Sequence, residues 1–478
     1  MNSYRFGSLR SGILCGAMFA ALGCGADDVD LERRAGDPVR EADGIAEHTF
    51  TRSGGCEEEW VPAAPMMEAR QGHAGTLLPN GTVLLLGGRD DDYPYPASAQ
   101  LYDPATDTWE IGGSLLSVPY RTQALLLPDG RVLVSPDLQI YDPATGLTTD
   151  VPPTPVEQGT GYGLEGATAT LLPNGKVLRT GGHEDWFTTD EAVLYDPQAD
   201  AWSAAGTLAE ARKYHSATLL PDGRVLVVGS AAMVGELPTA LASAELYDPD
   251  TNTWTPAAST NFPRATHTAT LLPSGRVLVV GGKPFYEGSE EDLEQHTEAQ
   301  TSAEIYDPAT DTWTLTSPMG VHRGWGHTST LLPNGRVLVV GNSYSPDVSL
   351  YDEMLDAWSA AAPLTTPREF ASATPLPDGS VLVAGGKHAL DINEPVTLDS
   401  VERYCGGISS PPEGTGGGGA GGAGGAGGAG GVEDPGGPGG PGSEGCSLVA
   451  PGASAPIPAG AALLGLLLLL QRRRAGRR

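Results

Sequence analysis

Histidine and arginine side chains recur at fixed places in this 478-residue sequence. Each place is counted back from a proline that follows Leu-Leu or a close variant of it. Histidine stands six residues before this proline and arginine nine before it: His73, His215, His267 and His327; Arg70, Arg212, Arg264 and Arg368. Arg121 and Arg323 lie slightly out of this register. Converging imidazoles could bind a metal ion, and the arginines could contact an anion or a sugar. A residue repeated in every unit can equally serve the unit itself, and we expect the arginines to pair with carboxylates or carbonyls.

The repeat that must position these side chains occurs seven times, around the prolines Pro79, Pro128, Pro173, Pro221, Pro273, Pro333 and Pro377. One copy contains a run of mostly small residues at 267–272, a Pro-Ser-Gly turn, and an apolar run at 276–280 that ends in Gly281-Gly282. Proline and glycine favour a tight turn, and an uninterrupted apolar run is typical of a strand buried on both faces. Two more strands follow, at 303–306 and around Trp313. Each copy therefore predicts a four-stranded sheet, and radial repetition of such sheets predicts a β-propeller.

The glycine doublet and a tyrosine–tryptophan pair at fixed spacing resemble the marks of the kelch family. Doublets stand at 87–88, 181–182, 281–282 and 385–386, and the pairs are Tyr102/Trp109, Tyr195/Trp202, Tyr247/Trp254, Tyr306/Trp313 and Tyr351/Trp358. The resemblance covers residues 56–405 and implies an all-β, seven-bladed kelch-type β-propeller. The last copy stops at Tyr404 without its tryptophan, so we expect the N-terminal strand that carries Trp60 to close the last blade. Kelch propellers include binding proteins and enzymes, so the resemblance implies a fold more strongly than a function.

Only two of the five cysteines, Cys56 and Cys405, belong to the expected propeller. Ring closure places Trp60 beside Tyr404, and this brings the neighbouring cysteines to one turn. We therefore predict a Cys56–Cys405 disulfide; the alternative is two unrelated thiols. Closing so long a loop should stabilise the fold by several kcal/mol in the chain-entropy description.

Residues 1–23 resemble a bacterial export signal, with a basic start and a short apolar run. The segment Ala21-Leu22-Gly23-Cys24 resembles a lipobox, which implies lipid attachment at Cys24; ordinary cleavage nearby is the alternative. Residues 24–55 are polar, charged and without periodicity. We expect them to form a flexible tether.

Residues 406–445 are a Gly-rich low-complexity segment, which we expect to be a flexible, disordered linker. Residues 446–478 bring a Gly-Cys-Ser triplet, an apolar stretch and an arginine cluster in that order. This order resembles the MYXO-CTERM class of bacterial sorting signals, which implies that Cys446 is processed or modified. A plain transmembrane anchor is the alternative. Both interpretations place the propeller outside the cytoplasm, at the outer membrane or cell surface, where a disulfide can persist.

The formal net charge is −31 at pH 7, and only four lysines are present. Such a surface repels phosphate backbones, which argues against nucleic-acid binding. We expect a monomer whose partner is a protein or polysaccharide of the cell envelope. Acidic loops after the doublets, at 90–92 and 283–302, could hold calcium, but they lack ordered ligand spacing and we expect no cofactor. Trp186, in another of these loops, joins the histidines and arginines as a candidate ligand-face residue.

No nucleophile motif or phosphate-binding loop stands out in the sequence. We expect a recognition module; the alternative is a carbohydrate-active enzyme of sugar-mutarotase type, which needs only a carboxylate and basic groups over the channel. A copper radical oxidase of the galactose-oxidase type needs a cysteine cross-linked to a tyrosine, and residues 57–404 contain no cysteine. Convergence of carboxylate, arginine and aromatic side chains at the channel mouth would favour the enzyme. A flat or plugged face would favour binding.

Overall fold

The structure is a computed structural model that describes residues 58–91, 95–154, 164–184, 187–234, 237–283, 301–342, 344–389 and 395–406. The chain divides into two units, Met1–Pro412 and Glu413–Arg478, and every described residue belongs to the first. Within these ranges no helix is long and apolar enough to cross a membrane. The predictions for Cys24, Cys446, Trp186 and the acidic loop at 284–300 lie outside the described residues.

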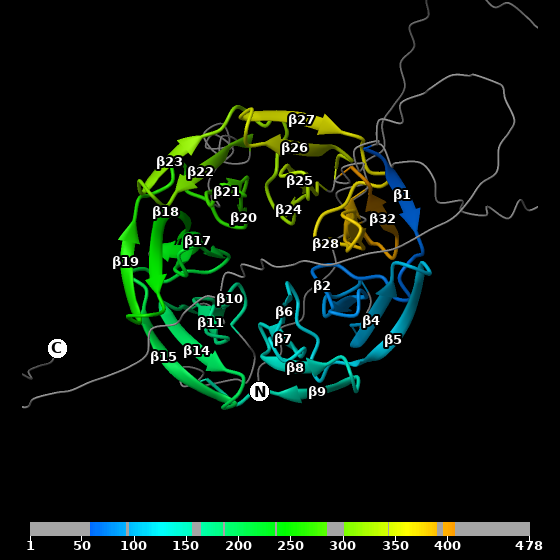
Figure 1. Ribbon diagram of the computed structural model, residues 1–478, viewed down its shortest axis with the longest axis horizontal. Helices are drawn as coiled ribbons and strands as arrows, with labels where there is room; N and C mark the ends of the chain where they lie inside the picture. The colour runs from blue at the N-terminus through cyan, green and yellow to red at the C-terminus, as the bar shows by residue number, and fades with distance from the viewer. Residues whose placement is uncertain are drawn as a thin grey trace, which may run out of the picture. The chain divides into compact units, whose positions relative to one another are not determined.

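Seven four-stranded antiparallel sheets surround a central channel (Figure 1). From the channel outward, the blades in chain order are β2 (Ala74–Leu77), β3 (Val83–Leu86), β4 (Ser98–Asp103) and β5 (Thr108–Ser114); β6 (Gln123–Leu126), β7 (Val132–Ser135), β8 (Gln139–Asp142) and β9 (Leu147–Asp150); β10 (Thr168–Leu171), β11 (Val177–Thr180), β14 (Glu191–Asp196) and β15 (Ala201–Thr207); β16 (Ser216–Leu219), β17 (Val225–Val234), β18 (Leu237–Asp248) and β19 (Thr253–Ala257); β20 (Thr268–Leu271), β21 (Val277–Val280), β22 (Ala303–Asp307) and β23 (Thr312–Leu315); β24 (Thr328–Leu331), β25 (Val337–Val340), β26 (Val348–Asp352) and β27 (Ala357–Ala361); and β28 (Ser372–Pro375), β29 (Val381–Ala384), β32 (Val401–Tyr404) and β1 (Trp60–Ala63). This arrangement confirms the predicted all-β, seven-bladed propeller.

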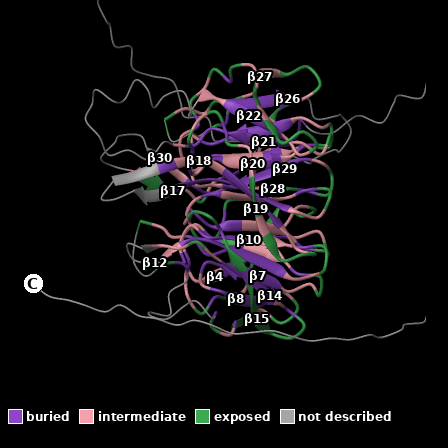
Figure 2. Ribbon diagram, turned by 90° about the vertical axis from the view of Figure 1, so that its left-hand side faces the viewer, coloured by how far each residue is buried: buried purple, intermediate pink, exposed green. Residues whose placement is uncertain are grey.

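Loops after the second strand of a blade extend on one side of the ring. They carry the hairpins β12 (His183–Glu184) with β13 (Phe187–Thr188) and β30 (Lys387–Ala389) with β31 (Pro395–Thr397). Figure 2 shows β12, β30 and the long ends of β17 and β18 emerging on the same side. We call the channel opening on this side, where the glycine doublets lie, the channel mouth.

The second strand of each blade is buried on both faces because it packs between two neighbouring blades. In β21, Val277 and Val279 contribute to the core shared with the fourth blade, whereas Leu278 and Val280 contribute to the core shared with the sixth. All four side chains are fully buried. The uninterrupted apolar run in the sequence therefore corresponds to two inter-blade cores of the ring.

The tyrosine–tryptophan pair organises the outer edge of a blade. In the fifth blade, Tyr306 and Trp313 are cross-strand partners with ring centroids 5.1 Å apart. The Tyr306 hydroxyl donates to Asp311 at 2.9 Å, and the Trp313 indole N–H donates to the carbonyl of Ala258 in the preceding connection at 2.8 Å. The repeated Tyr-Asp-Pro-x-Thr-Asp-x-Trp phrase thus closes one turn and attaches it to its neighbour.

Closure of the ring is made by the first strand of the chain. In Figure 1, β1 lies beside β32, and Trp60 is the cross-strand partner of Tyr404. The Trp60 indole donates to the carbonyl of Ala362 at 2.8 Å, as four of the five repeated tryptophans donate to a carbonyl of the preceding blade or connection. Closure by the strand that carries Trp60 is therefore confirmed, and it covers the edge that β32 would otherwise expose.

Cys405 is buried directly after the closing pair, and its backbone N–H donates to the carbonyl of Glu59 at 3.0 Å. Cys56 lies outside the described residues. The disulfide stays a prediction, with Cys405 placed beside the segment that leads to Cys56.

Candidate functional site

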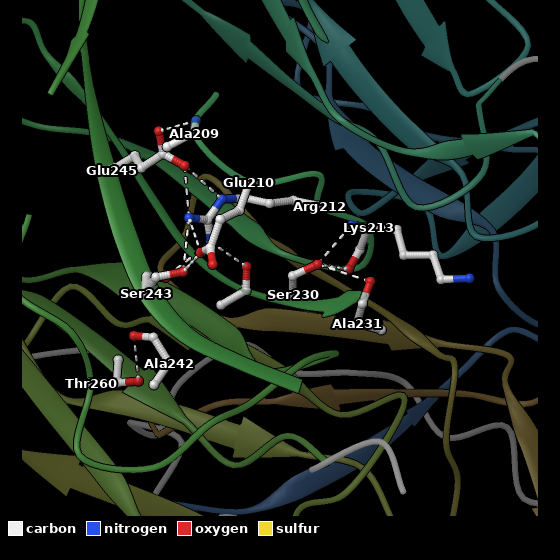
Figure 3. Close-up of polar contacts among 11 residues, drawn as sticks. Ala209, Glu210, Arg212, Lys213, Ser230, Ala231, Ala242, Ser243, Glu245 and Thr260 are labelled. Atoms are coloured by element: carbon white, nitrogen blue, oxygen red, sulfur yellow. Dashed lines mark hydrogen bonds and ion pairs between the residues drawn. The ribbon is translucent and has the colours of Figure 1, made fainter. Parts of the chain in front are cut away.

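The repeated arginines are buried inside the blades. Arg212 has a side chain that is 0% exposed; its Nη1 donates to the carbonyl of Gly229 at 3.0 Å, and its Nη2 donates to Glu245 at 2.7 Å. Figure 3 shows Arg212 turned toward Glu245 and Ser243, whereas the neighbouring Lys213 extends away from this cluster. Because the charge is paired and most donors are used within the blade, this arginine holds β17 and β18 to the incoming loop.

The same arginines explain the glycine doublets. The carbonyl of Arg212 accepts a hydrogen bond from the N–H of Gly182 in the preceding blade at 2.7 Å. A Cβ on Gly181 would overlap this carbonyl oxygen, and φ at Gly181 is +58°. The glycine doublet of one blade and the arginine that precedes the next blade therefore form one contact, which we call the inter-blade joint. Arg70 and Arg264 occupy equivalent places and are also fully buried.

The four repeated histidines lie in the channel wall and bond the preceding blade. Their Nε2 atoms contact Ser372 Oγ (His73, 3.0 Å), Thr168 Oγ1 (His215, 3.0 Å), Ser216 Oγ (His267, 2.8 Å) and the Val280 carbonyl (His327, 3.1 Å). Burial, reinforced by the nearby arginine, lowers the pKa of His73 and His215 to about 3. No group of three or more histidine, cysteine or acidic side chains suited to a metal ion occurs among the described residues. In this geometry the four imidazoles are neutral, and each connects its blade to the preceding one.

A cavity of about 320 Å³ opens at the channel mouth. Each blade contributes the residue that stands seven before its proline: Gly72, Arg121, Gly166, Tyr214, Thr266, Gly326 and Phe370. The four histidines also border this cavity, although each is at most 7% exposed. Trp325 completes the wall, and the cavity continues into a second space of about 380 Å³ between small residues of the inner strands.

All seven of these equivalent residues have a left-handed backbone, with φ between 54° and 73°. Hydrogen bonds between blades impose this conformation: the N–H of Tyr214 donates to Gly166, and the N–H of Thr266 donates to Tyr214, both at 2.8 Å. Glycine adopts such a backbone freely, whereas other residues are disfavoured by about 1–2 kcal/mol. Four blades nevertheless place Arg, Tyr, Thr or Phe here, and strained residues of this kind are concentrated at binding and catalytic sites.

Arg121 lies among the aromatic side chains of this ring. Its guanidinium carbon is 4.3 Å from the ring centroid of Trp325 and 4.6 Å from that of Tyr214. Its side chain is 17% exposed, and Nη1 is 3.8 Å from a carboxylate oxygen of Glu165. Neither Nε nor Nη1 has a hydrogen-bond partner among the described residues. The contacts with the aromatic rings stabilise the charge without using its N–H donors.

Three of the four lysines also lie on the mouth side. Lys213 directly precedes Tyr214, and Lys283 and Lys387 follow the doublets of the fifth and seventh blades. The Lys283 ammonium is 4.8 Å from the Trp325 ring centroid. Burial lowers the pKa of Lys213 and Lys283; the nearby Glu165 and Glu369 oppose this effect, and the charge of Arg121 adds to it. On a chain of net charge −31, cations are thus collected at one opening.

Glu165 supplies a carboxylate to the same wall. It accepts a hydrogen bond from the Tyr214 hydroxyl at 2.8 Å, and its backbone carbonyl is 2.7 Å from His183 Nδ1. Burial lowers the pKa of His183, an effect to which Lys213 adds. The mouth therefore holds carboxylate, arginine and aromatic groups within one cavity.

Sequence reasoning identified the histidines that border this cavity but not the side chains that fill its mouth. Lys213, Tyr214, Lys283, Trp325 and Phe370 were not singled out, and Arg121 was noted only for its displaced register. Two signals could have found them. The residue just before the repeated histidine position is the one that varies between copies, and three of the four lysines lie beside that position or directly after a glycine doublet. Ligand contact by His73, His215, His267, His327, Arg70, Arg212 and Arg264 stays a prediction.

Comparisons with known proteins find similarity to kelch-like proteins and to a galactose oxidase. "Kelch-like protein 34" of Homo sapiens is 28% identical over 219 residues, which are 45% of this chain and 32% of that protein. "Kelch-like protein 35" of Mus musculus is 27% identical over 257 residues, 54% of this chain and 40% of that protein. "Galactose oxidase" of Gibberella zeae is 27% identical over 167 residues, 34% of this chain and 21% of that protein. No family model matches the chain. The chain spans well under half the length of these curated relatives.

Proposed function

We propose that this kelch-repeat β-propeller is an exported recognition module, anchored in the cell envelope, that binds a protein or a glycan at the channel mouth. The observation that carries the proposal is the collection of Arg121, Lys213 and Lys283 among aromatic rings at one opening of an acidic protein. Non-glycine residues with a left-handed backbone line the channel mouth and support the proposal. If these positions served the fold alone, glycine would adopt the same backbone with less strain.

Envelope anchoring rests on the sequence of the two terminal segments, at Cys24 and Cys446. The proposal does not include copper radical chemistry. The similarity to galactose oxidase covers 34% of this chain, and no cysteine between residues 57 and 404 is available for a cross-linked tyrosine.

Binding of the full-length protein to isolated cell-envelope fractions tests this function. Substitution Trp325→Ala removes a wall of the cavity and should weaken binding by about tenfold or more. Met354→Ala, at an outer turn where Met354 is 94% exposed, should bind like the wild type. Protease treatment of the envelopes removes a protein ligand, and periodate oxidation removes a glycan ligand. Envelope binding that Trp325→Ala leaves unchanged, in a variant with wild-type thermal unfolding, would reject the channel mouth as the recognition site.

A sugar-mutarotase activity is the second candidate, and Glu165, Arg121 and Tyr214 form the carboxylate–arginine–aromatic pocket that we expect to favour it. Because this convergence supports the enzyme, its activity is tested alongside recognition. The Glu165 carboxylate is 41% exposed and can exchange a proton with a bound sugar hydroxyl. Interconversion of pure anomers, followed by NMR, tests the activity. A rate above the uncatalysed one that Glu165→Gln abolishes would support it, and an uncatalysed rate with the wild-type protein would reject it.

A further inference from the structure

We infer that the channel mouth selects a carboxylate-bearing sugar unit, such as a uronic-acid residue of an acidic polysaccharide. The inference rests on the proposed recognition function and names the chemical class of its ligand. It depends on the unpaired donors of Arg121, the flanking ammonium groups, the size of the cavity and its aromatic walls.

Arg121 carries the positive charge with which the carboxylate of the ligand would pair. Its side chain is largely buried, yet Nε and Nη1 have no hydrogen-bond partner among the described residues, and the Glu165 oxygen at 3.8 Å is too distant to be one. Buried donors without partners are unfavourable, and a planar guanidinium matches a carboxylate better than any other common anion except phosphate. A ligand carboxylate would therefore make the charge-assisted contacts that the protein itself does not make.

Lys213 and Lys283 place two more cations around the same opening. Lys213 Nζ is 5.8 Å from the ring centroid of Tyr214, and Lys283 Nζ is 4.8 Å from that of Trp325, so both flank the rings that hold Arg121. Glu165 and Glu369 offset part of this charge. Arg121, Lys213 and Lys283 thus lie near two carboxylates, and a ligand monoanion would add a partner for these three cations.

The dimensions of the mouth favour a ring-sized unit. Its volume of about 320 Å³, and the adjoining space of about 380 Å³, each lie within the range of roughly 300–1,000 Å³ for small-ligand pockets. The walls formed by Tyr214, Trp325 and Phe370 offer apolar faces against which the C–H face of a sugar can pack, while Arg121 takes its carboxylate.

Calorimetric titration of the full-length protein with trigalacturonate, at low ionic strength, tests the inference. The wild type should bind trigalacturonate and should not bind its methyl ester, which has the same rings without the charge. Arg121→Gln should weaken binding by about tenfold or more, and Lys213→Met or Lys283→Met by about threefold or more.

Two matched controls are available at the opposite end of the blades. Lys176 pairs with Asp196 at 3.3 Å, and Arg224 pairs with Asp222 at 2.7 Å, both beside the Pro-x-Gly turns. Lys176→Met and Arg224→Gln should bind trigalacturonate within about twofold of the wild type. The methyl-ester comparison uses only the wild-type protein, so it decides the matter even if a variant at Arg121 fails to fold.

Each contrary result has a separate meaning. Equal binding of the methyl ester would overturn the role of the carboxylate. Binding of hexaglutamate in place of trigalacturonate would overturn the sugar class and leave recognition at the mouth intact. If none of these probes binds, the inference fails, whereas the proposed recognition function fails only if Trp325→Ala also leaves envelope binding unchanged.

Discussion

The guanidinium carbon of Arg121 lies 4.3 Å from the ring centroid of Trp325, although the two residues come from the second and sixth blades. A residue that serves one blade or one joint contacts its neighbours in the ring. Arg121 instead reaches across the channel, and it does so from a left-handed backbone with φ of 56°. Contacts that break the seven-fold repeat in this way distinguish the channel mouth from the repeated joints around it.

Strain at Arg121 can be measured with a matched pair of substitutions. Arg121→Gly should leave the free energy of unfolding within about 1 kcal/mol of the wild type, because relief of the left-handed backbone offsets the lost contacts with aromatic rings. Arg121→Ala keeps the strain and should be about 1 kcal/mol less stable than Arg121→Gly. Urea unfolding measures both. Equal stability of the two variants would remove the argument from strain.

Removal of one partner of a buried ion pair should be costly at the inter-blade joint. Arg212→Met leaves the Glu245 carboxylate buried without its cation and should lower the free energy of unfolding by about 3–5 kcal/mol. Glu245→Gln should cost less, since Gln100 occupies the equivalent place in the first blade. Denaturant titrations of the two variants provide the comparison. A smaller loss for Arg212→Met than for Glu245→Gln would contradict the assigned role of the joint.

The buried histidines should make the propeller sensitive to acid. Burial, aided by the neighbouring arginine, lowers the pKa of His215 in the folded state to about 3, and that of His327 to about 4, below the value near 6.5 of an unfolded chain. Between these pKa values the unfolded state binds more protons, so stability falls as the pH drops below about 6.5, by up to ~1.4 kcal/mol per pH unit for each histidine. Well above pH 6.5 these groups contribute no pH dependence, because they are neutral in both states.

Urea unfolding at pH 7.5, 6 and 5 tests this dependence. His215→Gln should reduce the loss of stability between pH 6 and pH 5, whereas His322→Gln, at an exposed position, should leave the loss unchanged. Identical pH dependence in all three proteins would show that other groups control acid unfolding.

The predicted Cys56–Cys405 disulfide would link the closing strand to the last blade. Cys405→Ser should lower the thermal midpoint of unfolding, and Cys56→Ser should lower it equally. A disulfide reductant should lower the midpoint of the wild type and leave the midpoints of the two variants unchanged. Non-reducing peptide mapping gives the direct answer. Two separate peptides with free thiols would eliminate the disulfide.

The architecture could be predicted because each repeated sequence motif specifies a local feature of the blade. The Pro-x-Gly turn occurs in all seven copies, the Tyr–Trp pair in five and the glycine doublet in four, and each of these motifs fixes one contact of a blade. The structure explains why the doublet needs glycine: the carbonyl of Arg212 lies where a Cβ on Gly181 would be. Sequence reasoning linked neither residue to the other, since they belong to different copies.

The channel mouth was harder to predict for the opposite reason. Arg121, Tyr214 and Phe370 stand at one equivalent position, which holds glycine or threonine in the other copies, so no single residue type marks it. Only the ring brings them together, and a comparison of copies treats them as deviations from the repeat. Distances along the sequence carry no information about which blades face each other across the channel.

Acetylation of the four lysines, read by mass spectrometry with and without isolated envelope ligand, tests the central claim most directly. One spectrum reports Lys213, Lys283 and Lys387 on the mouth side and Lys176 at the opposite end of the blades, without any substitution. The account predicts that ligand protects Lys213 and Lys283 and leaves the acetylation of Lys176 unchanged. Protection of Lys176 alone, or equal acetylation of all four lysines with and without ligand, would contradict recognition at the channel mouth.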